Sequence, residues 1–181
     1  MSGEPRLKVV FDSDRIGERV RAIAEDINRV YRDKPLVAIC VLKGAFMFFG
    51  DLVRALDRPD IEVDFVRLAS YGKSMTSSGH VRFSKDIEID IRGKHVLVIE
   101  DIVDSGKSMR FLIDQLSVRD PATLSLAALV DKKERRSEEV RVDFGGFELP
   151  SGFLVGYGLD YAEKYRTLPD ICELEFPDEK K

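Results

Sequence analysis

The chain has 181 residues, of which 44% are hydrophobic and 34% charged, and this is the composition of a folded globular domain with a sizeable core. Its formal net charge of −4 gives no general electrostatic reason to expect nucleic acid or an anionic membrane as a partner. The longest apolar run is far shorter than the roughly 18 residues of a membrane helix, and the two cysteines fit a reducing compartment, so we expect one cytoplasmic domain over residues 1–181.

The first predicted element is a helix that Ser13 or Asp14 caps, because apolar residues from Ile16 to Val30 recur at spacings of four and three. Residues 36–42 form a continuous apolar run, which indicates a central strand covered on both faces. A helix over 45–56 follows. Alternation of apolar and acidic residues then predicts a strand over 61–65.

The pattern fails between Ser70 and about Asp86, where the chain is small, polar and rich in glycine. A long loop inside a compact domain is uncommon and often covers a site, so we expect residues 71–85 to form a flexible lid; a passive loop is the alternative.

The second half continues the alternation of strands and helices. Strands are expected over 95–99 and 124–130, with a helix over 109–116 between them and short strands over 153–156 and 171–174. This order predicts an α/β fold with a mostly parallel central sheet flanked by helices. In such sheets ligands bind beyond the carboxyl ends of the strands, where Lys43, residues 100–108 and Lys132 fall.

The segment after the strand at 95–99 has the features of a phosphate site. Gly106 permits a backbone turn that gathers N–H groups, and a helix N-terminus follows it. Asp104, Ser105, Lys107 and Ser108 complete the loop. A nucleotide-binding P-loop is excluded, because the position of its first glycine is an aspartate that would oppose a triphosphate.

Glu100 and Asp101 are adjacent carboxylates that we place at the end of the apolar strand. Such a pair suits vicinal sugar hydroxyls, which donate to carboxylate oxygens, or a Mg²⁺ ion bound through oxygen ligands. Acids at strand ends are also often simply exposed, or they cap the next helix.

The segment from Val96 to Met109 resembles the phosphoribosyl pyrophosphate motif of type I phosphoribosyltransferases: apolar residues, an acidic pair, two apolar residues and Asp-Ser-Gly-Lys-Ser. Further segments resemble the hypoxanthine-guanine phosphoribosyltransferases in the same order along the chain. They are Leu42-Lys43-Gly44, Ser70-Tyr71, Lys132, residues 153–157, and Leu159-Asp160-Tyr161 with Arg166. Two departures are Leu154, where valine is common in the family, and Gly145, where a larger apolar residue is usual.

The resemblance implies transfer of a phosphoribosyl group to a 6-oxopurine, with Mg²⁺ as cofactor. It implies a base-binding hood from about residue 132 to 181 together with the N-terminus, and a homodimer or homotetramer.

It also implies roles for single residues. The 5′-phosphate would bind residues 104–108, and Asp104 would act as general base. Glu100 and Asp101 would bind the ribose hydroxyls and assist Mg²⁺, and Asp160 would reach a second Mg²⁺ through water. Pyrophosphate would meet Arg166, Ser70, Tyr71 and the Lys43-Gly44 backbone after a cis Leu42–Lys43 peptide, and the purine would meet Lys132, Phe153, Leu154 and Asp160.

Other interpretations stay open for these residues. From composition alone, residues 132–136 are typical of a solvated face, Phe153 of a core aromatic residue, and Lys43 of a strand end. Xanthine or adenine could replace the expected base. A regulator that binds RNA would need a basic surface and could lack Asp104, but the chain is acidic and has Asp104.

Overall fold

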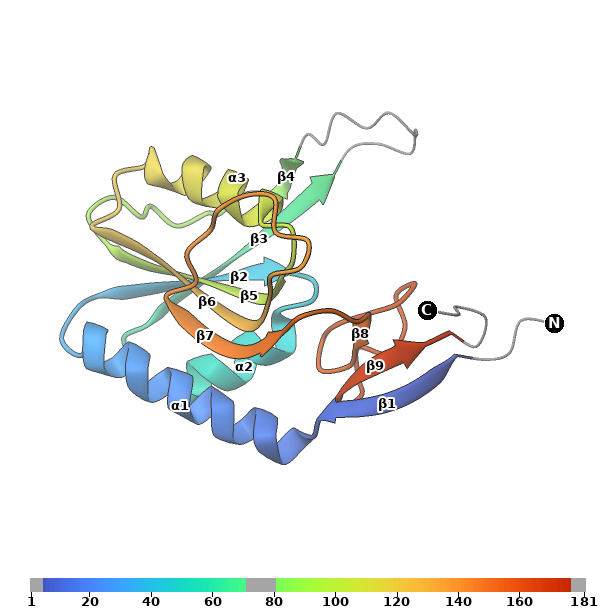
Figure 1. Ribbon diagram of the computed structural model, residues 1–181. Helices are drawn as coiled ribbons and strands as arrows, with labels where there is room; N and C mark the ends of the chain where they lie inside the picture. Colours follow the sequence, from blue (N-terminus) through green and yellow to red (C-terminus); the bar gives the residue numbers. More distant parts are fainter. Residues whose placement is uncertain (1–4, 71–80, 177–181) are drawn as a thin grey trace.

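The computed structural model describes residues 5–70 and 81–176 (Figure 1). Within these residues the elements are β1 (Arg6–Phe11), α1 (Ser13–Tyr31), β2 (Leu36–Leu42), α2 (Phe46–Ala55), β3 (Glu62–Ser70), β4 (Val81–Lys85), β5 (His95–Val103), α3 (Lys107–Ser117), β6 (Thr123–Lys132), β7 (Phe144–Leu149), β8 (Leu154–Val155) and β9 (Ile171–Glu175).

The larger of two sheets has six strands in the order β4-β3-β2-β5-β6-β7. All neighbouring pairs are parallel except β3 with β4. In Figure 1, α1 and α2 cover one face of this sheet and α3 covers the other. The predicted α/β class with a mostly parallel sheet is therefore confirmed.

The central strands alternate between two hydrophobic clusters, because successive side chains of a strand point to opposite faces. In β2, Ala38 and Cys40 pack with α1 and α2, whereas Val37 and Ile39 pack with α3. Strand β5 divides its residues in the same way. Burial on both faces explains why these strands have continuous apolar runs.

Helix α1 begins one or two residues earlier than the sequence predicts, depending on which of the two expected caps is taken. Its N-cap is Asp12, whose Oδ1 accepts from the backbone N of Arg15 at 2.9 Å, so the expectation of Ser13 or Asp14 is wrong. The apolar stripe is buried as expected, except that Val30 is 48% exposed and the buried position at this end is Tyr31. The tyrosine hydroxyl reaches Ser125 Oγ at 2.7 Å.

The prediction of an irregular segment between Ser70 and Asp86 is wrong for residues 81–85. Residues 81–85 form β4, which pairs antiparallel with β3, and Phe83 packs against the cluster under α3. Residues 71–80, most of the expected lid, lie outside the described residues.

The smaller sheet has three strands in the order β1-β9-β8 and joins the two ends of the described chain. β1 pairs antiparallel with β9, and β9 with β8. The sequence analysis missed β1 and β7. Gly145 lies in β7, where an added Cβ would meet nothing closer than Val142 Cγ1 at 3.8 Å, so nothing in the structure explains this glycine.

Across the described ranges, no helix is long and apolar enough to span a membrane.

Candidate active site

A cavity of about 1400 Å³ opens between the carboxyl ends of the parallel strands and the smaller sheet. It is larger than most single-ligand pockets and has room for two substrates. The predicted site residues among its lining are Lys43, Gly44, Asp101, Asp104, Lys132, Phe153, Leu154, Asp160 and Arg166. The structure thus brings together side chains that are up to 123 positions apart, from Lys43 to Arg166.

Other predicted residues do not line this cavity. Glu100 is buried beside it, and Ser105 to Ser108 continue from Asp104 into α3. Ser70 is the last residue of β3, and Tyr71 lies outside the described residues.

The acidic pair lies inside β5, not after it as the sequence predicted, because the strand continues to Val103. Glu100 and Asp101 are each only 8% exposed. Burial raises the pKa of Glu100 well above its ordinary value, and the neighbouring Asp101 carboxylate raises it further. Two acids buried side by side make this end of the strand suited to a cation or to hydroxyl donors.

Gly44 connects this acidic pair to the smaller sheet's side of the cavity. A Cβ on Gly44 would lie 1.7 Å from Asp101 Oδ2, and a Cβ on Gly158 would lie 2.0 Å from the Gly44 oxygen. The preceding Leu42–Lys43 peptide is cis, as expected from the resemblance. The turn after β2 is therefore in close contact with the Asp101 carboxylate on one side and with the Gly158 backbone on the other, and glycine suits both positions.

The phosphate loop has the local geometry that its sequence predicts. Gly106 has φ +84° and is the N-cap of α3. Asp104 precedes it, and its buried Oδ1 has no hydrogen-bond partner among the described residues. A buried carboxylate oxygen without a donor is costly, so a ligand that brings a proton or donor to it would be stabilised.

Arg136 supports this loop from behind and was missed by the sequence analysis. Its Nε donates to the backbone oxygen of Asp104 at 3.0 Å, and its Nη2 donates to the backbone oxygens of Val103 and Lys132. The same guanidinium forms an ion pair with Asp131. Composition suggested a solvated face at residues 132–136, and no periodic signal marks Arg136 as different from Arg135.

Lys132 ends β6, beside the end of β5, and its side chain reaches the segment before β8 that contains Phe153. Lys132 is 7% exposed, and its Nζ donates to the Gly152 oxygen at 2.8 Å, which uses one of three donors. Phe153 is 47% exposed and meets Tyr161 edge to face at 5.5 Å. The alternatives of a solvated lysine and a core phenylalanine are therefore wrong.

Charged residues form a network at the end of the cavity near β2. Arg166 Nη2 lies 2.8 Å from Asp160 Oδ1 and 3.1 Å from Glu163 Oε2. Lys43 Nζ lies 2.8 Å from the same Glu163 oxygen. Lys43 and Arg166 are thus cations near one another, as a site for a polyanion requires.

Residues 8–162 match the family model described as the phosphoribosyl transferase domain. A hypoxanthine-guanine phosphoribosyltransferase from Aquifex aeolicus (strain VF5) is 44% identical over 171 residues, which are 94% of this chain and 96% of that protein. The chain belongs to the hypoxanthine-guanine phosphoribosyltransferase family. The enzyme of that name from Dictyostelium discoideum is 43% identical over 171 residues, which are 93% and 95% of the two chains.

The fold of a solved hypoxanthine-guanine phosphoribosyltransferase agrees with this membership. The structure from Bacillus anthracis str. 'Ames Ancestor' has a TM-score of 0.87 and 39% identity, and covers 93% of this chain and 99% of that one. Every predicted site residue except Arg166 falls within residues 8–162. The resemblance inferred from the motifs is therefore confirmed for the family.

Three charged residues of the smaller sheet also line the cavity of this phosphoribosyltransferase and were not predicted: Lys8, Glu173 and Glu175. Lys8 on β1 lies 3.8 Å from a carboxylate oxygen of Glu173 on β9. The alternation of charged and apolar residues from Arg6 to Val9 is a strand signal that could have indicated them.

In the described part of the chain, no group of three or more His, Cys, Asp or Glu side chains is arranged to hold a metal ion. Mg²⁺ is usually bound by one or two carboxylates together with substrate phosphates and waters, not by a protein cage. The buried pair Glu100 and Asp101, whose mutual repulsion a cation would relieve, fits such a shared site.

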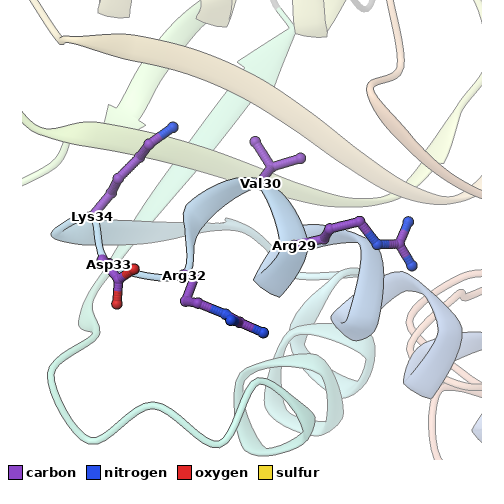
Figure 2. Close-up of a pocket in the computed structure, with 5 residues that line it drawn as sticks. All are labelled: Arg29, Val30, Arg32, Asp33 and Lys34. Atoms are coloured by element: carbon purple, nitrogen blue, oxygen red, sulfur yellow. The ribbon is translucent and has the colours of Figure 1, made fainter.

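A second cavity lies at the end of α1, far from this chemistry. Its lining residues are Arg29, Val30, Arg32, Asp33 and Lys34, and Figure 2 shows their side chains pointing in different directions. Lys34 precedes β2, so this cavity is at the amino end of the parallel strands. Ligands of parallel sheets bind at the other end, and we assign no site here.

Proposed function

We propose that the protein transfers the phosphoribosyl group of phosphoribosyl pyrophosphate to N9 of hypoxanthine or guanine, in purine salvage. The products are IMP or GMP and pyrophosphate. The observation that carries this proposal is the presence, in the lining of one cavity, of Lys132, the exposed Phe153 ring and Asp104, whose Oδ1 has no hydrogen-bond partner among the described residues.

The base lies against the smaller sheet in this proposal. The ring of Phe153 stacks on the purine, and Lys132 donates to its O6. Leu154 contributes backbone groups. Because an ammonium has donors and no acceptor, it matches a carbonyl at C6 and does not match the amino group of adenine.

The sugar phosphate lies on the side of β5 and α3. Residues 104–108 hold the 5′-phosphate with backbone N–H groups and hydroxyls at the start of a helix. Glu100 and Asp101 would accept from the ribose hydroxyls and would hold Mg²⁺, and Asp160 would help to hold a second ion. When bound, Mg²⁺ supplies positive charge to the leaving pyrophosphate oxygens.

The bond from C1 of the sugar to the pyrophosphate oxygen breaks, and its electron pair leaves with pyrophosphate. The Lys43-Gly44 backbone and Arg166 bind this leaving group, and we add the Lys43 ammonium, which lies near Arg166, as a second cation for it. This is an electrostatic stabilisation of the transition state. N9 of the purine forms the new bond from the opposite face, and Asp104 accepts the proton from N7.

The test is an assay of nucleotide formation by the purified protein with phosphoribosyl pyrophosphate, Mg²⁺ and one base at a time. We expect IMP and GMP to form with release of pyrophosphate, and adenine to react at least about 30-fold less efficiently. Absence of product from both 6-oxopurines would overturn the proposal. Sedimentation of the same sample tests the prediction of a homodimer or homotetramer.

A further inference from the structure

Glu163 has no role in the proposed mechanism, yet its carboxylate contacts the two cations that the mechanism assigns to pyrophosphate. Its Oε2 lies 2.8 Å from Lys43 Nζ and 3.1 Å from Arg166 Nη2. The side chain of Glu163 is 65% exposed and forms ion pairs with both groups. As a carboxylate it places a negative charge between the two groups proposed to bind pyrophosphate.

The turn that presents Glu163 has an unusual backbone. Ala162, Glu163 and Tyr165 have φ of +51°, +64° and +74°, values that residues other than glycine rarely adopt. The backbone N of Glu163 donates to Asp160 Oδ2 at 2.9 Å, and Tyr161 and Lys164 form an isolated bridge. Such conformations persist only where surrounding contacts hold them, so the position of this carboxylate is built into the fold.

Pyrophosphate and Glu163 need the same donors. Lys43 and Arg166 line the cavity, whereas Glu163 is not among its lining residues and its side chain is 65% exposed. An anion that enters the cavity and binds the two cations meets a second negative charge, that of Glu163, which contacts the same two cations. The two anions repel each other, and the donors of Lys43 and Arg166 must be divided between pyrophosphate and Glu163.

We propose that Glu163 is an internal counter-anion of the pyrophosphate subsite, which competes with pyrophosphate for Lys43 and Arg166 and so favours its release. This inference rests on the proposed function, because that function assigns the two cations to pyrophosphate. Glu163 acts through Lys43 and Arg166 and is a positioning residue, not a catalytic one.

A purely supporting role makes the opposite prediction. If Glu163 only holds Lys43 and Arg166 in the geometry that pyrophosphate needs, its removal weakens pyrophosphate binding. The sign of the change in affinity therefore separates competition from support.

The experiment is calorimetric titration of the full-length protein with pyrophosphate in the presence of Mg²⁺, for the parent and for Glu163→Gln. Glutamine keeps the size of the side chain and removes its charge. Because exposed ion pairs are weak, we expect the Kd of pyrophosphate to fall by roughly 2- to 10-fold in the variant. Product inhibition by pyrophosphate should strengthen by the same factor, and the Kd of IMP should not change.

The matched control is Glu62→Gln, which removes a similar ion pair, with Lys94 Nζ at 2.7 Å, at the start of β3. It should leave the Kd of pyrophosphate as in the parent. An unchanged or raised Kd in Glu163→Gln overturns the inference. If the parent itself does not bind pyrophosphate, the assignment of the subsite in the proposed function fails first, and the inference fails with it.

Discussion

The two walls of the cavity are built in different ways. What we call the phosphate wall comes from one contiguous segment, residues 100–108, of which Asp101, Ile102 and Asp104 line the cavity. The base wall combines Lys132 from the end of β6, Phe153 beside β8, and Lys8 and Glu173 from the pair of β1 and β9. The first wall is fixed by local backbone geometry, and the second by pairings between distant segments.

This difference predicts different results of substitution. On the phosphate wall, a substitution should affect the binding of the sugar phosphate and the rate of the chemical step. On the base wall, it should affect the choice of base. Residues that support a wall without lining the cavity should affect the stability of the fold or the position of a whole loop. Substitutions in the two walls and in these supporting residues test the comparison.

The largest effect is expected at Asp104. Asp104→Asn removes the proposed proton acceptor and keeps the shape of the loop, so kcat should fall by about 10²- to 10⁴-fold with little change in the Tm. Steady-state kinetics with hypoxanthine measure this. A variant with kcat within a few-fold of the parent would exclude Asp104 as general base. Asp114→Asn, at an exposed pair with Arg110 on α3, is the control and should retain kcat.

The next effect is expected on the base wall. Lys132→Met removes the proposed donor to O6, and the preference for hypoxanthine over adenine should fall by roughly 30- to 1000-fold in kcat/KM, which corresponds to about 2–4 kcal/mol. The KM of phosphoribosyl pyrophosphate should change little. Lys133→Met is the control, because Lys133 pairs with Glu148 on the exposed side. A parental preference in Lys132→Met would contradict the proposed role.

Arg136 tests whether the phosphate wall depends on support from outside its own segment. Arg136→Met leaves Asp131 and the backbone oxygens of Val103 and Asp104 without their donor. The free energy of unfolding should fall by about 2–3 kcal/mol. The KM of phosphoribosyl pyrophosphate should rise more than the KM of hypoxanthine.

Chemical denaturation and kinetics on one preparation measure both changes. Arg141→Met, at an exposed pair with Asp143, should alter neither. Equal rises in the two KM values would mean that Arg136 stabilises the whole domain and not the loop.

The smallest effect is expected at Asp64, in the scaffold. It is 5% exposed and accepts from the backbone N of Phe65, Glu88 and Ile89. Burial raises the pKa of Asp64, but these three donors and Lys85 outweigh burial, and the net shift is downward. A lowered pKa stabilises the folded state above the unfolded value of about 3.9, and this stabilisation is lost as the pH falls through the folded pKa.

Asp64→Asn should therefore lower the free energy of unfolding by about 1–2 kcal/mol at pH 7, with unchanged kinetics. The difference from the parent should shrink below about pH 4. Urea denaturation at several pH values measures it. Asp26→Asn, at an exposed pair with Arg29, should show no such dependence, and a difference for Asp64→Asn that grew on acidification would contradict the assignment.

The contrast between the two walls also explains what the sequence could predict. The alternating elements and the parallel sheet follow from apolar runs, and the turn at Gly106 follows from one segment. β1 was missed because Leu7 and Val9 are about half exposed and its partner β9 lies at the other end of the chain. The roles of Arg136 and Glu163 depend on contacts with residues outside their own segments, which no local pattern contains.

The motif resemblance identified residues of the base wall that composition alone would have assigned differently. Lys132 lies in a charged run and Phe153 looks like a core residue, yet both line the cavity. Physical patterns predict burial well where a whole element is apolar, and poorly where one polar side chain is buried beside a cavity.

The contacts of Gly44 have a consequence for attempts to redesign this enzyme. Asp101 and Gly158 both press against it, at separations that leave no room for even one carbon. A larger residue at Gly44 would displace the Asp101 carboxylate, and one at Gly158 would displace the backbone of Gly44. Either change would alter the distance between the sugar and the base in the proposed complex. To widen the base pocket, substitution of Phe153, whose side chain is about half exposed, is therefore a better choice than substitution of Gly44 or Gly158.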